Sequence, residues 1–325
     1  MRVVVAGGSG LIGRALIDSL LADGEDVTVL TRDPSRARKR LPAGCEVREW
    51  DGGRDPRAVI ELAGVGVVVN LCGVPVGPRP WTPRRKREII ASRVAPADAL
   101  VRAMAALAPA DRPKAYISAA GTDWYTDLDA QPATEAAAPP PRDGPARGAG
   151  AAPFLWTVCD EWERAALRAE PLGVRVALLR TSFVLAPEAS LMGLVALPFR
   201  LWLGGPFGDG RQWFSWVHID DVVGLYRLAI ADDRVSGAVN VAAPEPCRQG
   251  EFAAAIGRAL GRPSRLRVPG FAIRLALRGQ ATLALGSRRV VPARALELGY
   301  RFAYRDVTAA TAAALGRTRA ADDRE

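Results

Sequence analysis

The chain has 325 residues and a formal net charge of +9, and 49% of its residues are hydrophobic, as is usual for a globular protein. Its positive charges are almost all arginines spread along the sequence, a distribution that argues against a nucleic-acid partner. Four scattered cysteines and the single histidine, His218, argue against a multi-ligand metal site and favour the reducing cytoplasm. No apolar run reaches the length of a membrane span, and we expect no membrane partner.

The sequence opens with a β-branched run, residues 3–5, that leads directly into glycines spaced G-x-x-G-x-x-G. A helix is predicted over 11–22, ended by Gly24, and a second strand over 26–30. Glycines at such a strand-to-helix turn let the backbone approach a pyrophosphate, and the helix N-terminus attracts that anion. The stretch therefore predicts a dinucleotide site made by Gly7, Ser9, Gly10, Leu11, Ile12 and Gly13.

The residue that ends the second strand indicates which dinucleotide binds. In this type of fold an acidic residue there binds the ribose 2′-hydroxyl, whereas an arginine accommodates a 2′-phosphate. Arg32 holds the position, with Arg36 close by, and Asp33 comes one residue late. NADP(H) is therefore favoured over NAD(H). A solvated basic loop is the interpretation that we favour for four further charges, those of Arg36, Arg38, Lys39 and Arg40.

A continuous apolar run over 64–73 is typical of a central parallel strand covered on both faces. It ends at Gly73, where small residues let the backbone approach a cofactor at the carboxyl edge of the sheet. Thr82 as N-cap and Pro83 at the first helical position open a long helix predicted through 107.

Strands and helices alternate over the remainder of the first 260 residues. Strands are predicted over 114–120, 174–179 and 238–242, and helices over 154–170, 222–231 and 250–260. This alternation predicts an α/β fold with a doubly wound parallel sheet. Two segments depart from it. The Ala/Pro/Gly-rich segment 129–153 is expected to be a mobile surface loop, and 203–221 is either a pocket wall or a structured loop whose aromatic side chains fill core.

The predicted domain organisation is an NAD(P)-binding Rossmann domain over 1–245, with 186–216 on its substrate side. A smaller, mostly helical C-terminal lobe follows over 246–315. We expect the charged residues 316–325 to form a frayed tail.

A set of motifs distributed over nearly the whole chain resembles one known family. The motifs are the glycines of 7–13, Thr31-Arg32, 70–73, Trp81-Thr82, Lys86, Glu88, Ser92-Arg93, Cys159, Trp162-Glu163, Arg180-Thr181, 204–206, 210–216, 218–221, Asn240, Ala243-Pro244 and 279–299. Together they resemble the atypical extended short-chain dehydrogenase/reductases of the NAD-dependent epimerase/dehydratase superfamily. Within it, the chain is similar to epimerase-family proteins sometimes mislabelled as cell-division inhibitors, which carry their own C-terminal domain of unknown function.

This resemblance implies NADP(H) as the cofactor and names further residues that contact it. Pattern alone favours plain helix-surface charges for Glu88 and Arg93, and the resemblance raises both above that interpretation. The implied contacts are Thr31, Arg32, Leu71, Cys72, Glu88, Arg93 and Val184.

This chain lacks the Tyr-x-x-x-Lys motif that carries out proton transfer in the superfamily. Working members carry Tyr-x-x-x-Lys on a helix, where the lysine lowers the pKa of the tyrosine and the tyrosine relays the proton that accompanies hydride transfer. Alignment on Glu163 places Leu155 and Cys159 at these two positions, and neither can do this chemistry. No lysine follows Lys114.

Two classes of function stay open. One is an oxidoreductase or epimerase that acts on a small-molecule substrate through an unconventional proton donor. The other is a non-catalytic NADP(H)-binding protein whose lobe meets a partner or reports redox state. For the first class we predict Tyr125 as the donor and Ser118 as hydrogen-bond partner of a substrate oxygen, with Asp123 and His218 as other candidates. Cys159 is expected to be an inert thiol.

Overall fold

The computed structural model describes residues 1–55, 60–77, 79–125, 131–138 and 153–316, which fall into two compact units. The first unit comprises Met1–Trp124, Phe154–Arg180 and Val223–Val239, and the second comprises Tyr125–Pro153, Thr181–Val222 and Asn240–Glu325. The second unit thus also takes in Thr181–Val222, which lies within the predicted domain 1–245. Among the described helices, none is long and apolar enough to cross a membrane.

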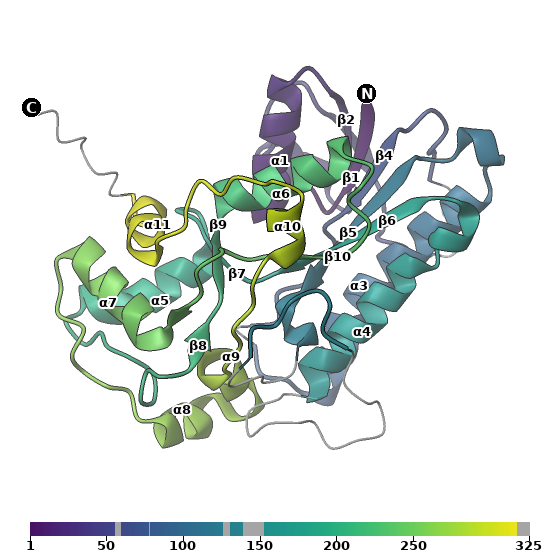
Figure 1. Cartoon of the computed structure of the whole chain (residues 1–325). Helices are drawn as coiled ribbons and strands as arrows, with labels where there is room; N and C mark the ends of the chain where they lie inside the picture. The colour runs from purple at the N-terminus through teal and green to yellow at the C-terminus, as the bar shows by residue number, and fades with distance from the viewer. Residues whose placement is uncertain (56–59, 78, 126–130, 139–152, 317–325) are drawn as a thin grey trace, which may run out of the picture. The chain divides into compact units, whose positions relative to one another are not determined.

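The described residues of the chain form a seven-stranded sheet in the order β10-β6-β5-β4-β1-β2-β3 (Figure 1). The pairs β1–β2, β1–β4, β2–β3 and β4–β5 are parallel, which confirms the predicted doubly wound α/β fold. The chain leaves β1 toward β2 on one side and returns to β4 on the other, so the strand order reverses at β1. The strands are β1 (Arg2–Ala6), β2 (Asp26–Thr31), β3 (Glu46–Glu49), β4 (Val67–Asn70), β5 (Ala115–Gly121), β6 (Arg175–Thr181) and β10 (Gly237–Val241).

Helices cover both faces of this sheet, and the predicted boundaries hold to within a few residues (Figure 1). On one face, Val4 and Val68 share a core cluster with Leu100 of α3 and Ala166 of α4. On the other face lies α1, next to α6, whose Arg227 contacts Asp23 at the end of α1. The helices are α1 (Leu11–Ala22), α2 (Pro34–Arg38), α3 (Pro83–Ala105), α4 (Pro153–Leu167) and α6 (Ile219–Ala231).

Glycines fix the turn between β1 and α1. Gly7 has a φ of +78°, and a Cβ there would lie 2.9 Å from the backbone nitrogen of Cys72. A Cβ on Gly13 would lie 2.4 Å from the Gly8 carbonyl oxygen. The turn thus packs directly on the end of β4, and the first turn of α1 packs directly on the loop before it, because no side chain stands between these backbones.

The second unit is built from short paired strands and helices. β7 (Phe183–Leu185) pairs in parallel with β9 (Trp216–His218), and β8 (Trp213–Phe214) pairs antiparallel with β11 (Cys247–Arg248). The region after β11 is helical, as predicted, and α7 packs against α11. Its helices, with α5 before them, are α5 (Ser190–Arg200), α7 (Gln249–Leu260), α8 (Gly270–Leu277), α9 (Thr282–Leu285), α10 (Ala293–Glu297) and α11 (Val307–Ala314).

The described part of the predicted mobile loop, 131–138, is instead held in the second unit. Ala133 is buried, its N–H donates to the Arg289 carbonyl at 2.7 Å, and its own carbonyl accepts from Val291 at 3.0 Å. The loop prediction is therefore wrong for this part, because a short bridge to a segment distant in sequence fixes it. Residues 129–130 and 139–152 of the loop, and 317–325 of the predicted tail, lie outside the described residues.

The crowded glycine in α1 can be tested against an uncrowded one. We expect Gly13→Ala to lower the free energy of unfolding by about 1–3 kcal/mol, because the new methyl group meets backbone that cannot move aside. Gly193→Ala in α5, where no atom lies within 4 Å of the added Cβ, should raise that energy by about 0.5–1 kcal/mol. Urea unfolding of both variants measures this, and equal effects of the two substitutions would contradict the packing described above.

Candidate functional site

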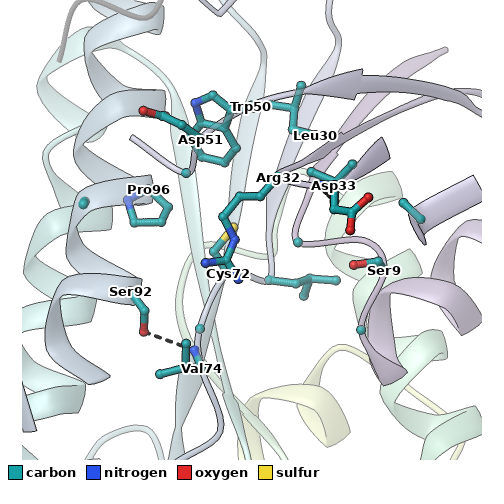
Figure 2. Close-up of a pocket in the computed structure, with 18 of the residues that line it drawn as sticks. Ser9, Leu30, Arg32, Asp33, Trp50, Asp51, Cys72, Val74, Ser92 and Pro96 are labelled. Carbon is teal, nitrogen blue, oxygen red and sulfur yellow. Dashed lines mark hydrogen bonds between the residues drawn. The ribbon is translucent and has the colours of Figure 1, made fainter. Parts of the chain in front are cut away.

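A cavity of about 760 Å³ lies in the first unit at the carboxyl ends of β1, β2 and β4 (Figure 2). In Figure 2, Arg32 crosses the middle of the view, with its guanidinium directed toward Cys72 and with Ser92 and Pro96 of α3 on the opposite wall. The cavity therefore occupies the place where the strand order reverses, which is where open α/β sheets bind ligands. The predicted cofactor residues that line it are Gly7, Ser9, Gly10, Thr31, Arg32, Leu71, Cys72, Gly73 and Glu88.

The other predicted cofactor residues lie elsewhere. Leu11, Ile12 and Gly13 form the first turn of α1, directly behind the lining residue Gly10. Val184 lies in β7, in the second unit. Arg93 is a buried residue of α3.

The α1 N-terminus faces the cavity without a side-chain cap among the described residues. Gly10 is its N-cap, and a Cβ there would meet the Gly7 carbonyl oxygen at 3.6 Å and no other atom within 4 Å. Helix N-termini present unpaired N–H groups and a positive partial charge. The open side of Gly10 therefore leaves this end accessible to an anion.

The Asp33 carboxylate caps the N-terminus of α2. Its carboxylate accepts from the backbone N–H of Arg36 at 2.9 Å and from the Ser35 hydroxyl at 2.7 Å. These two hydrogen bonds hold the pKa of Asp33 below its usual value. Asp33 therefore acts as the N-cap of α2, and Arg32 is the residue at the end of β2 whose side chain crosses the cavity in Figure 2.

Four arginines of the described chain, Arg32, Arg36, Arg40 and Arg54, line the cavity. Arg36 and Arg40 are exposed, as the solvated-loop interpretation expects, and they also line the cavity, which that interpretation did not anticipate. Arg36 and Arg40 are four residues apart, so the helical turn at α2 brings both side chains to the side that faces the cavity. Arg38, between them, donates instead to the Val47 carbonyl at 3.4 Å.

The residues that follow β3, which no sequence motif predicted, form another wall of the cavity. Trp50, Asp51 and Gly52 line the cavity, next to Arg54. Asp51 closes this turn by accepting from the backbone N–H groups of Gly53 and Asp55. Gly52 has a φ of +79°, so the pair Asp51-Gly52 carries the signal of a tight turn that could have located this wall.

Hydrogen bonds of Asn70 hold the loop after β4. The Asn70 carboxamide accepts from the backbone N–H of Cys72 at 3.1 Å and donates to the Tyr116 hydroxyl at 2.9 Å. Burial raises the pKa of the Cys72 thiol to about 12. Cys72 is therefore a neutral wall of the cavity rather than a nucleophile.

Arg93 supports the same loop from α3. Its Nη1 donates to the Val74 and Ile89 carbonyls, both at 3.1 Å, and its guanidinium lies over the Trp162 ring, 4.8 Å from the centroid. Burial lowers its pKa to about 10. Arg93 is thus no plain surface charge, whereas Glu88 is half exposed and pairs with Arg85 at 2.9 Å.

The two positions aligned with Tyr-x-x-x-Lys are apolar and buried. Leu155 and Cys159 of α4 belong to the core of the first unit. The Cys159 sulfur would lie 3.2 Å from a Cβ on Gly121, at the end of β5. This packing is what an inert thiol requires, although the effect of Cys159 on activity stays a prediction.

The two predicted catalytic hydroxyls are both buried, each within its own unit. Ser118, in β5, donates to the Ala119 carbonyl at 3.1 Å. Tyr125, in the second unit, donates to the Asn240 carboxamide oxygen at 2.8 Å. Asn240 in turn donates to the Val291 carbonyl at 2.9 Å, so Tyr125 ends a buried hydrogen-bond chain. The catalytic roles of both residues stay predictions.

The aromatic segment before α6 packs as core of the second unit. Trp216 is fully buried, and Phe214 stacks on Phe252 with ring centroids 4.3 Å apart. These two side chains fit the prediction of a structured loop whose aromatic side chains fill core, rather than that of a pocket wall. Trp213 differs, because the guanidinium groups of Arg248 and Arg289 lie 3.7 Å and 4.7 Å from its ring centroid.

His218 and Asp221 contact the segment 300–304. The His218 ring lies 3.9 Å from the Tyr304 ring, and its Nδ1 is 3.3 Å from the Asp220 carboxylate. Asp221, fully buried, accepts from the backbone N–H groups of Ala303 and Tyr304 at 2.7 Å and 3.0 Å. This arrangement anchors 300–304 to the start of α6.

A buried ion pair joins α4 to β6. Arg180 donates from Nε and Nη2 to the two Glu163 carboxylate oxygens at 2.7 Å and 2.8 Å. Its guanidinium also lies 3.6 Å from the Trp124 ring centroid. Because both charges are almost completely buried, each depends on the other for its neutralisation.

Removal of one charge of this pair tests its role. We expect Glu163→Gln to lower the free energy of unfolding by about 3–5 kcal/mol, because the Arg180 charge then lies buried without a counter-ion. Asp98→Asn, which breaks a pair between α3 and the exposed Arg168, is the matched control and should cost less than about 1 kcal/mol. Chemical denaturation measures both, and a Glu163→Gln variant as stable as the control would refute this role.

His218 predicts a pH dependence of stability. Burial lowers its pKa from 6.5, although Asp220 and Asp221 oppose this effect. The unfolded chain therefore binds this proton more readily, so the His218 contribution is present above the unfolded pKa and is lost as the pH falls below it. We expect the loss of unfolding free energy between about pH 7.5 and about pH 5.5 to be smaller in His218→Gln than in the wild type. An equal or larger loss of unfolding free energy in the variant would mean that the folded protein does not disfavour protonation of His218.

The chain matches known protein families and individual proteins over most of its length. The model of the NAD dependent epimerase/dehydratase family matches residues 3–242, and a domain of unknown function, DUF1731, matches 268–314. The epimerase family protein SDR39U1 homolog of Arabidopsis thaliana, described as chloroplastic, is 36% identical over 314 residues, covering 94% of this chain and 84% of that protein. An epimerase family protein of Mycobacterium leprae is 35% identical over 302 residues, covering 92% of this chain and 91% of its own.

A solved structure is similar over almost its full length. The human epimerase family protein SDR39U1 (isoform 2), crystallised with NADPH, has a TM-score of 0.82 at 30% identity, covering 97% of this chain and 99% of that one.

Proposed function

Because the chain belongs to the NAD-dependent epimerase/dehydratase family, we propose that it binds NADP(H) and acts as an oxidoreductase or epimerase-like protein on a small molecule. The observation that carries the cofactor assignment is the position of four arginines around one cavity with the glycine turn. The human relative crystallised with NADPH supports it. The free cysteines fit a reducing compartment, and we propose the cytoplasm.

The residues present fit the two charged parts of this cofactor. The uncapped N-terminus of α1, open at Gly10, would hold the pyrophosphate. Arg32, Arg36, Arg40 and Arg54 would hold the 2′-phosphate, since guanidinium groups bind phosphate through paired, charge-assisted hydrogen bonds. Asp33 also lines the cavity, and its Oδ1 is bonded to Ser35 and Arg36 of α2.

The chemistry that NADP(H) supplies when bound is hydride transfer. The chain's own part is to bind and orient it. Asn70 and Arg93 hold the backbone of 72–74, which forms one wall of the cavity. The neutral Cys72 thiol keeps that wall apolar. For the proton that accompanies hydride, we propose donation by the Tyr125 hydroxyl, with Ser118 binding a substrate oxygen.

A second candidate function is favoured by one observation. The positions aligned with the superfamily's Tyr and Lys hold buried apolar side chains, and the Tyr125 hydroxyl donates to Asn240. A chain that keeps its nucleotide cavity without these groups can serve as a non-catalytic NADP(H)-binding protein. Activity measurements distinguish the two functions.

The cofactor assignment predicts a selective loss of affinity. Arg32→Ala should weaken NADPH binding by about tenfold or more, because one arginine–phosphate contact contributes about 1.5–3 kcal/mol, and should leave NADH binding nearly unchanged. Arg36→Ala should weaken NADPH binding in the same direction. Arg38→Ala is the matched control, since this side chain points to Val47 and does not line the cavity. Isothermal titration with both nucleotides measures this, and an NADPH affinity that Arg32→Ala leaves intact would exclude the assignment.

The proton-donor assignment predicts that kcat depends on the Tyr125 hydroxyl and not on its hydrogen-bond partner. With a substrate found by screening carbonyl compounds for NADPH oxidation, Tyr125→Phe should lower kcat by about a hundredfold or more. Asn240→Ala removes the partner of the same hydrogen bond but leaves the phenol, and should keep most of kcat. Cys159→Ala should change activity little. Full kcat in Tyr125→Phe would exclude this residue, and a wild type silent across the panel would favour the non-catalytic function.

A further inference from the structure

Helix α5 of the second unit presents an apolar stripe to solvent. Leu191, Leu194, Leu197 and Leu201 recur every three or four residues, so they share one side of the helix. Each of them is between 49% and 60% exposed. The opposite side of α5 is already packed, since Met192, Ala196 and Phe199 are buried. The stripe is therefore a second apolar face that the fold of this unit does not use.

The stripe continues past the end of α5. Trp202 and Leu203 are both 58% exposed, and Trp202 has a φ of +64°, a conformation that favours glycine. The Leu203 N–H donates to the Pro198 carbonyl and the Trp202 N–H to the Phe199 carbonyl, which closes the helix with Trp202 at a position where glycine is usual. The chain thus holds an exposed tryptophan in a place that backbone strain alone disfavours.

A second segment adds to the same face. The Leu266 N–H donates to the Gly204 carbonyl at 3.2 Å, and Leu266 is 52% exposed. The Arg262 guanidinium lies over the Trp202 ring, 4.4 Å from its centroid. We call these side chains the Leu–Trp surface: Leu191, Leu194, Leu197, Leu201, Trp202, Leu203 and Leu266. An exposed apolar face of this kind marks an interaction site.

Within 189–208 and 252–296, the segments that hold the Leu–Trp surface, all the charges have one sign. Arg200, Arg262, Arg265 and Arg267 are all exposed, and within the described chain none of them pairs with a carboxylate. The sequence contains no Asp or Glu between 189 and 208, or between 252 and 296. The partner must therefore be apolar where it meets leucine and tryptophan, and anionic where it meets arginine.

This charge pattern decides between possible partners. A two-fold contact with a second copy would bring the same arginines together, because such an interface uses one patch on both subunits. The segments 189–208 and 252–296, which hold the Leu–Trp surface, contain no carboxylate to neutralise them. A bilayer of anionic phospholipid meets both requirements, since leucine and tryptophan enter the boundary between head groups and acyl chains while arginines contact the phosphates.

We propose that the Leu–Trp surface docks the protein on an anionic phospholipid bilayer, lying on the membrane without crossing it. This proposal departs from the expectation of no membrane partner, which rested on the lack of an apolar run long enough to span. A docking face built from one side of α5 and from 201–203 and 266 has no such run. The proposal does not depend on the nucleotide cavity, which lies in the other unit.

Co-sedimentation with vesicles tests the proposal. The full chain should bind vesicles of phosphatidylglycerol and phosphatidylcholine, and bind pure phosphatidylcholine much more weakly, with the difference shrinking as salt is raised. The double variant Leu194→Ser/Trp202→Ser should weaken binding more than tenfold. Arg262→Gln and Arg265→Gln should each weaken binding to anionic vesicles about fivefold, the loss expected for one basic residue at such a surface.

Matched controls separate docking from misfolding and from general charge. Leu296→Ser changes another exposed leucine outside the Leu–Trp surface, and Arg301→Gln another exposed arginine; both should bind vesicles as the wild type does. All variants should keep wild-type NADPH titrations. A wild type that stays in the supernatant with anionic vesicles would overturn the proposal. So would a concentration-dependent dimer, seen by light scattering without lipid and abolished by Leu194→Ser/Trp202→Ser.

Discussion

The direct contact between two backbones at the β1–α1 turn is the constraint on which the nucleotide cavity depends. Gly7 meets the backbone of Leu71 and Cys72 at the end of β4, and Gly13 meets Gly8. Side chains at these glycines would separate the turn from β4 and the helix from the turn. With glycine there, the uncapped end of α1 lies at the point where the strand order reverses, and the arginines that follow β2 reach the same cavity.

Buried arginines extend this arrangement into the core of the first unit. Arg93 lies over Trp162 and holds the loop after β4, while Arg180 lies over Trp124 and pairs with Glu163. Guanidinium groups suit such sites because they stack on aromatic rings and still donate several hydrogen bonds. Cys159, at the position that the resemblance aligns with the superfamily's lysine, is buried in the core of this unit. This is the physical reason that two classes of function stay open.

The sequence was informative where a local rule determines local structure. Thr82 and Pro83 predicted the start of α3, and the structure confirms it, with Thr82 accepting from the Arg85 N–H. β3 was missed because Glu46-Val47-Arg48-Glu49 is a polar edge strand without an apolar run, and Trp50 to Gly52 were missed with it. The pocket-facing positions of Arg36 and Arg40 follow from their spacing of four, a signal that was present. The pairing of Ala133 with Val290 joins segments too distant in sequence for any local pattern to predict.

The central claim is that the arginine cluster recognises the 2′-phosphate of the adenosine ribose. The most direct measurement is competition against bound NADPH by two fragments that differ in this group alone, ADP-ribose and its 2′-phosphate. The account predicts that the 2′-phosphorylated fragment competes at least about tenfold more strongly, and that the advantage shrinks as salt is raised. Equal competition by the two fragments would contradict it.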